Sequence, residues 1–76
     1  MNALLPGVRT ALVRAVVAVN ASFARLPEAK RPELTDWDKL DAEVDAACAS
    51  GDRARALRAI ETWRDHWLAK FEEARS

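Results

Sequence analysis

The stretch AACASGDRARALRAI, residues 46–60, decides the fold, because it places the end of one helix next to the start of another. Gly51 suits the left-handed position that closes a helix, and Asp52 suits the N-cap of the helix that follows. A joint as short as Ser50-Gly51-Asp52 leaves little freedom to the two helices and favours an antiparallel hairpin. The sequence therefore predicts a helical hairpin in the C-terminal part of the chain.

The two helices of this hairpin are expected at residues 36–50 and 53–74. Thr35 is the expected N-cap of the first, with Asp38 three positions on as an acidic variant of the capping box. The joint also resembles the turn of a tetratricopeptide-type helix pair, which implies a hairpin but, in a single copy, no repeat array. The apolar stripes are expected at Trp37, Leu40, Val44 and Ala47 or Cys48, and at Leu57, Ile60, Trp63, Trp67, Leu68 and Phe71.

A further helix is expected at residues 5–26, because Pro6 suits a first helical turn and Pro27 stops the helix. The polar linker 27–34 then turns the chain. This helix carries one apolar stripe, Leu5, Val8, Leu12, Ala15, Val19, Ser22 or Phe23, and Leu26, and a second apolar side, Val13, Val17, Ala21 and Ala24. A helix that is apolar on most of its circumference is expected to be buried on more than one side.

The predicted fold class is all-α: a three-helix bundle, with the long N-terminal helix packed on the hairpin, in one domain covering residues 1–76. The expected core is Leu12, Val19, Phe23, Trp37, Leu40, Val44, Leu57, Ile60, Trp67 and Phe71. A core built from 76 residues contributes only about 3–5 kcal/mol of stability. Because Cys48 is the single cysteine, no internal disulfide can add to this, and self-association is expected.

The charges balance at twelve basic and twelve acidic residues, but they are segregated along the chain. Residues 1–27 carry Arg9, Arg14 and Arg25 and no acid, whereas residues 36–45 hold five acids against Lys39. In a small bundle this segregation favours ion pairs between helices over a nucleic-acid or membrane contact. Acids of the second helix are also expected to compensate Arg53, Arg55 and Arg58 at the start of the third.

The segment WRDHW, residues 63–67, contains the residue types of an active site, but a helix disperses them. Trp63 and Trp67 lie one turn apart on the buried side, while His66 points outward, so no catalytic residue is assigned. Arg64 falls inside the apolar arc and is expected at the edge of the core, stacked on a tryptophan or bonded to an acid such as Asp41. The alternative is an anchor for an acidic group of a partner.

The second helix has an acidic face, Asp38, Asp41 and Asp45, with Asp36 and Glu43 on its other flank. Ala42, Ala46 and Ala49 lie between the flanks. An exposed helix surface is the favoured interpretation, since alanine is the best helix former. The alternatives are close approach of another helix and mimicry of the phosphates of DNA.

Neither a transmembrane helix nor a signal peptide is expected. Arg9 and Arg14 interrupt the one long apolar stretch, and no basic residue precedes it. A free thiol fits a cytoplasmic protein, and the alanine- and arginine-rich composition fits a bacterial genome.

The predicted function is that of a small non-catalytic protein–protein interaction module or accessory subunit, with no metal and no cofactor. The partner is expected to be a protein, including a second copy in a homodimer, and not nucleic acid or membrane. The candidate interface residues are Val13, Val17, Ala24, Trp63, Arg64 and Trp67. Two alternatives remain: a nucleic-acid-related factor, either an acidic inhibitor of a nucleic-acid enzyme or a weak binder through the basic first helix, and a peripheral membrane protein.

Overall fold

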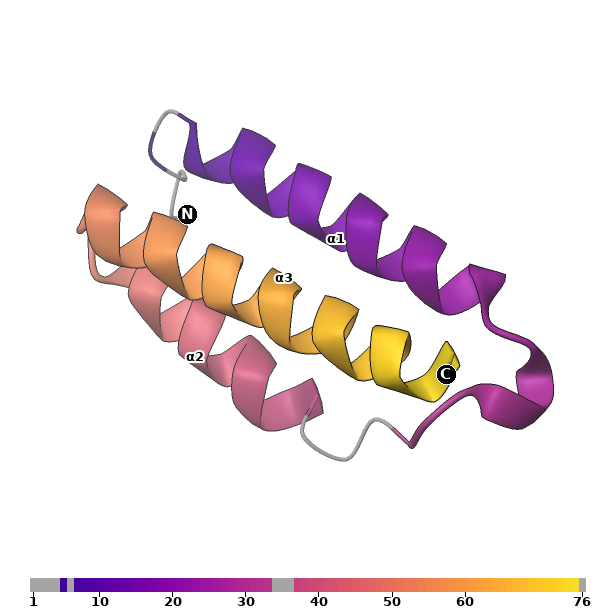
Figure 1. Cartoon of the computed structure of the whole chain (residues 1–76). Helices are drawn as coiled ribbons and strands as arrows, with labels where there is room; N and C mark the ends of the chain where they lie inside the picture. Colours follow the sequence, from indigo (N-terminus) through magenta and orange to yellow (C-terminus); the bar gives the residue numbers. More distant parts are fainter. Residues whose placement is uncertain (1–4, 6, 34–36, 76) are drawn as a thin grey trace.

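The computed structural model describes residues 5, 7–33 and 37–75, which form three α-helices and one short 3₁₀-helix (Figure 1). The α-helices are α1 (Val8–Arg25), α2 (Trp37–Ala49) and α3 (Arg53–Arg75), and the 3₁₀-helix η1 (Glu28–Lys30) lies between α1 and α2. No strand occurs in the described ranges. The fold class is therefore all-α, and the three-helix bundle is confirmed.

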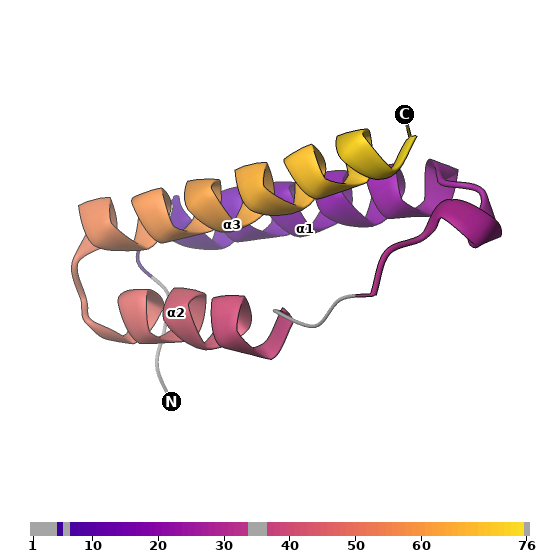
Figure 2. The same cartoon turned by 60° about the horizontal axis from the view of Figure 1, so that its bottom comes forward.

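The long helix α3 is the central element of the bundle. Both α1 and α2 pack against it (Figures 1 and 2). Along the chain the helices alternate in direction, so that α1 and α3 run the same way and α2 runs the opposite way (Figure 1). The molecule is elongated, with extents of 40 × 20 × 20 Å. Because α1 and α2 both pack on α3, each has an outer side that no other described helix covers extensively.

The joint between α2 and α3 has the predicted conformation. Gly51 has a φ of 78°, in the left-handed region, and the backbone N–H of Arg55 donates a hydrogen bond to Oδ1 of Asp52 at 3.1 Å. The hydroxyl of Ser50 donates to the carbonyl of Ala47 at 2.6 Å and closes the last turn of α2. Side chains thus satisfy backbone groups that a helix end leaves unpaired. The antiparallel hairpin is confirmed.

Replacing this N-cap is expected to lower the free energy of unfolding by about 1 kcal/mol. In Asp52→Ala the N–H of Arg55 loses its acceptor, while nothing in the core changes. Asp52→Asn is the matched control, since asparagine caps helices as well as aspartate does. Urea unfolding measures the free energy of unfolding of both variants. An equal decrease in Asp52→Ala and Asp52→Asn would show that the side-chain cap contributes nothing.

Helix α1 starts later than predicted, at Val8 instead of about residue 5. Gly7 precedes it with a φ of 85°, which a right-handed helix does not contain. A Cβ at Gly7 would lie 3.0 Å from Nη2 of Arg53, so the start of α1 passes close to the start of α3. The predicted role of Pro6 and the cap at Thr35 concern positions outside the described ranges.

The connection between α1 and α2 is more structured than the predicted polar linker. It contains η1, and Nζ of Lys30 donates a hydrogen bond to the carbonyl of Arg75 at 3.2 Å. Nε of Arg31 donates to the carbonyl of Leu26 at 3.3 Å, and its guanidinium lies 5.2 Å from the ring centre of Phe23. These contacts hold the connection against the ends of α1 and α3.

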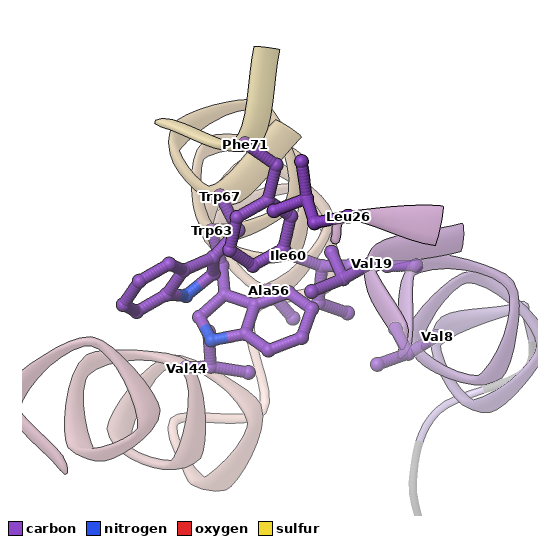
Figure 3. Close-up of a cluster of buried hydrophobic side chains, with 10 residues drawn as sticks. Val8, Val19, Leu26, Val44, Ala56, Ile60, Trp63, Trp67 and Phe71 are labelled. Atoms are coloured by element: carbon purple, nitrogen blue, oxygen red, sulfur yellow. The ribbon is translucent and has the colours of Figure 1, made fainter. Parts of the chain in front are cut away.

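The core consists of apolar side chains from all three helices (Figure 3). Half of the predicted core residues are buried: Val19, Val44, Ile60, Trp67 and Phe71. The other half, Leu12, Phe23, Trp37, Leu40 and Leu57, are partly buried and pack against them. The remaining buried residues are Val8, Ala15, Leu26, Ala47, Ala56 and Trp63, of which Ala56 lies on none of the predicted stripes.

Aromatic side chains connect the helices within this core. The ring of Trp37 in α2 lies 5.4 Å from that of Trp63 and 4.9 Å from that of Trp67, both in α3. Phe23 of α1 packs on Phe71 of α3 at 5.3 Å. Rings at these separations add to the stability gained from burial. The segment 63–67 is therefore a packing seam.

Candidate functional site

The most exposed apolar surface lies on α1, on the side turned away from α3. Val13 is 55% exposed, Val17 is 61% exposed and Val16 is 36% exposed, and these are the large hydrophobic residues exposed in the described chain. Ala24, also exposed, continues the surface toward the end of the helix. We call Val13, Val16, Val17 and Ala24 the outer face of α1. The exposure of the predicted interface residues Val13, Val17 and Ala24 leaves them available to a partner.

The outer face of α1 is flanked by positive charge. Arg9, Arg14 and Arg25 are exposed, and the helix contains no acidic residue. Within the described ranges, no ion pair joins these arginines to a carboxylate. Among the described residues, the ion pairs predicted between helices are thus not formed; α1 and α2 each pack on α3, and the arginines of α1 are exposed. The basic flanks of α1 remain available for other contacts.

Arg64 pairs with acids, as expected, but with acids other than Asp41. Its Nε donates a hydrogen bond to Oδ1 of Asp65 at 3.0 Å, and its Nη2 lies 4.0 Å from Oε1 of Glu61. Asp41 instead accepts a hydrogen bond from Nε1 of Trp63 at 3.1 Å. Pairing of a partly buried Arg64 with an acid is therefore as expected, but the acids are Asp65 and Glu61 of the same helix and not Asp41, since they lie within reach of a side chain that is 40% exposed.

Trp63 and Trp67 are interior residues, with 4% and 0% of their surface exposed. Nε1 of Trp67 finds no acceptor among the described residues, whereas Nε1 of Trp63 is bound to Asp41. Nζ of Lys70 lies 5.4 Å from the centre of the Trp67 ring. The two tryptophans offer no surface to a partner, so the interface hypothesis is corrected to exclude them.

A groove of about 460 Å³ lies between α1 and α3. Its lining residues are Ala11, Arg14, Ala15, Ala18, Leu57, Ile60, Glu61 and Arg64. The small alanines of α1 make room for it, and guanidinium groups from both helices belong to its walls. Arg14 lies between this groove and Val17, so the groove borders the outer face of α1.

The predicted acidic face of α2 divides into two parts. Asp38 and Asp45 are exposed, while Asp41 is half-buried and holds the indole of Trp63. Asp41 therefore has a structural role that its sequence neighbours do not share. Ala42, Ala46 and Ala49 are exposed, as expected, and Glu43 lies exposed on the other flank.

Cys48 and His66 carry no sign of a reactive centre. Burial, together with the negative charge of Asp45, raises the pKa of the Cys48 thiol, which disfavours the nucleophilic thiolate. His66 is exposed and meets the ring of Trp67 edge-on at 5.0 Å. Among the residues that the structure describes, no group of three or more histidines, cysteines or acids could hold a metal ion. Nor does any described helix have the length and apolar character needed to cross a membrane.

Comparison with protein families, curated proteins and solved structures finds no match to this chain. The functional assignment therefore depends on the surface of the molecule alone.

Proposed function

We propose that this protein is a small non-catalytic interaction module that binds protein partners, including a second copy of itself, through the outer face of α1. The observation that carries this proposal is the exposure of Val13, Val16 and Val17, which lie together on one helix. Covering a valine side chain fully contributes about 1.5–3 kcal/mol. Because a chain of 76 residues has only a small core, burial of these three valines against a partner would add substantially to its stability.

The composition of the face supports a protein partner. Apolar residues in the centre and arginines at the edges are typical of protein interfaces, whose cores lack charge and whose rims are polar. The free cysteine fits the reducing environment of the cytoplasm, where we place the protein.

Val17→Glu is expected to abolish self-association, because it places a charge in the centre of the outer face of α1. Light scattering after size exclusion, across a dilution series, measures the mass. We expect a concentration-dependent mass above the 8.4 kDa of one chain in the wild type and a monomer in the variant. Val17 is exposed, so the helical circular dichroism should not change.

Ala69→Glu is the matched control, since it adds the same charge at an exposed position of α3. This variant should behave as the wild type. An assembly that persists in Val17→Glu would refute the proposed face, and a wild type that stays monomeric at every concentration would refute self-association.

A further inference from the structure

We propose that the outer face of α1 docks on α2 of a second copy of this chain. The inference rests on the proposed function, because it names the partner of the surface assigned there. Two faces of the same molecule are then complementary: an apolar, basic one on α1 and a small, acidic one on α2. Each of these helices packs on α3 and leaves its outer side open.

Charge complementarity is the first argument for this pairing. The exposed arginines of α1 and the exposed acids Asp38, Glu43 and Asp45 of α2 form no ion pair with one another within the described chain. The whole chain has a formal net charge of zero, so two copies approach each other without overall repulsion. Local attraction between α1 of one copy and α2 of the other can then select the docking surface and its orientation.

The same charges oppose the simplest alternative, in which α1 of one copy packs on α1 of the other. Each α1 carries Arg9, Arg14 and Arg25 and no acid. An interface built from two such helices brings like charges together, which disfavours it. An α2 partner presents carboxylates to the same arginines.

Side-chain size is the second argument. Val13 and Val17 are one turn apart and project from α1, while Ala42, Ala46 and Ala49 recur at the same helical spacing on the outer side of α2. Small residues allow a second helix to approach closely, so that branched side chains can fill the space above them. On α2, Asp38 and Asp45 border one edge of the alanines and Glu43 the other. The valines at the centre of the α1 face therefore match the alanines of α2, and the arginines at its edges match the acids of α2.

A charge exchange between the two helices tests the inference. One variant, Asp38→Lys/Asp45→Lys, makes both faces basic, and a second variant, Arg9→Glu/Arg14→Glu, makes both acidic. The four substituted residues are exposed. Each variant alone should associate at least about tenfold more weakly than the wild type, since tenfold corresponds to only 1.4 kcal/mol. An equimolar mixture should recover the wild-type mass, because both kinds of contact then join opposite charges.

One further variant, compared with Val17→Glu and the charge variants, distinguishes the ways in which the proposals can fail. Glu28→Lys/Glu73→Lys changes the net charge by the same amount at exposed positions outside α1 and α2, and it should associate as the wild type does. If Val17→Glu dissociates the assembly but Asp38→Lys/Asp45→Lys leaves it intact, α2 is not the partner and the proposed function stands. If the charge variants fail to recover association on mixing, the inference is also overturned. If neither Val17→Glu nor the α2 variant changes the mass, both proposals fail.

Discussion

Trp67→Ala is expected to leave most of the protein unfolded at room temperature. The side chain is fully buried at the centre of the core and contacts the rings of Trp37 and Phe71. Truncating a buried tryptophan to alanine costs about 3–5 kcal/mol. This is about the whole stability that a core of this size supplies, also about 3–5 kcal/mol. The expected result is the loss of most helical circular dichroism and of a cooperative urea transition.

Arg58→Ala is the control for this prediction, because it shortens a long side chain of α3 that is exposed. A surface substitution of this kind changes stability by about 0.5 kcal/mol or less. Both variants should be measured at the same protein concentration as the wild type, because self-association adds concentration-dependent stability. A Trp67→Ala protein that unfolds cooperatively at the wild-type midpoint would show that Trp67 does not organise the core.

Ala56→Leu is expected to destabilise the bundle by about 1–3 kcal/mol, as overpacking of a filled core does. Ala56 is 1% exposed and belongs to the cluster that contains Val8, Val44 and Ile60 (Figure 3). Leucine adds three carbon atoms at this position, and the helices must separate to accommodate them. The midpoint of thermal unfolding should fall, although leucine has nearly the same helix propensity as alanine.

The same substitution at an exposed position of α3 is the control. Ala69→Leu adds the same atoms where they meet solvent, so its thermal midpoint should stay close to that of the wild type. If Ala56→Leu also left the midpoint unchanged, the helices would not be closely packed around residue 56.

The hairpin was predictable from sequence because its determinants are local. Gly51 and Asp52 act on the residues next to them, through a backbone angle and a hydrogen bond spanning three residues. The apolar periodicity of the helices likewise follows from geometry that every α-helix shares. The start of α1 depended instead on Gly7, which lies near Arg53, a residue remote in the chain. No local pattern identifies that approach.

Side-chain partners were harder to predict than helices. Asp41 was expected to meet an arginine, but it accepts a hydrogen bond from the indole of Trp63, and Arg64 pairs with neighbours on its own helix. Helical position specifies the direction in which a side chain starts, whereas several acceptors lie within reach of a long one. The burial of Ala56 was not predicted for a related reason. Alanine suits buried and exposed helix positions alike, so only the packing of the helices shows that this one is buried.

The exposed valines of α1 illustrate what sequence could identify and what it could not. The second apolar side of this helix was visible in the spacing of Val13, Val17 and Ala24. Whether another part of the chain covers that side depends on how α1 and α2 are arranged around α3. The structure leaves Val13 and Val17 more than half exposed.

The three tryptophans allow unfolding of the protein to be followed by its intrinsic fluorescence. Trp37 is carried by α2, and Trp63 and Trp67 are carried by α3, while α1 has none. Their rings are 4.9 Å and 5.4 Å apart across the contact between α2 and α3. Fluorescence therefore follows the separation of α2 from α3, whereas far-ultraviolet circular dichroism follows all three helices. If α1 detaches first, the two signals will change at different denaturant concentrations, and if the bundle unfolds as one unit they will coincide.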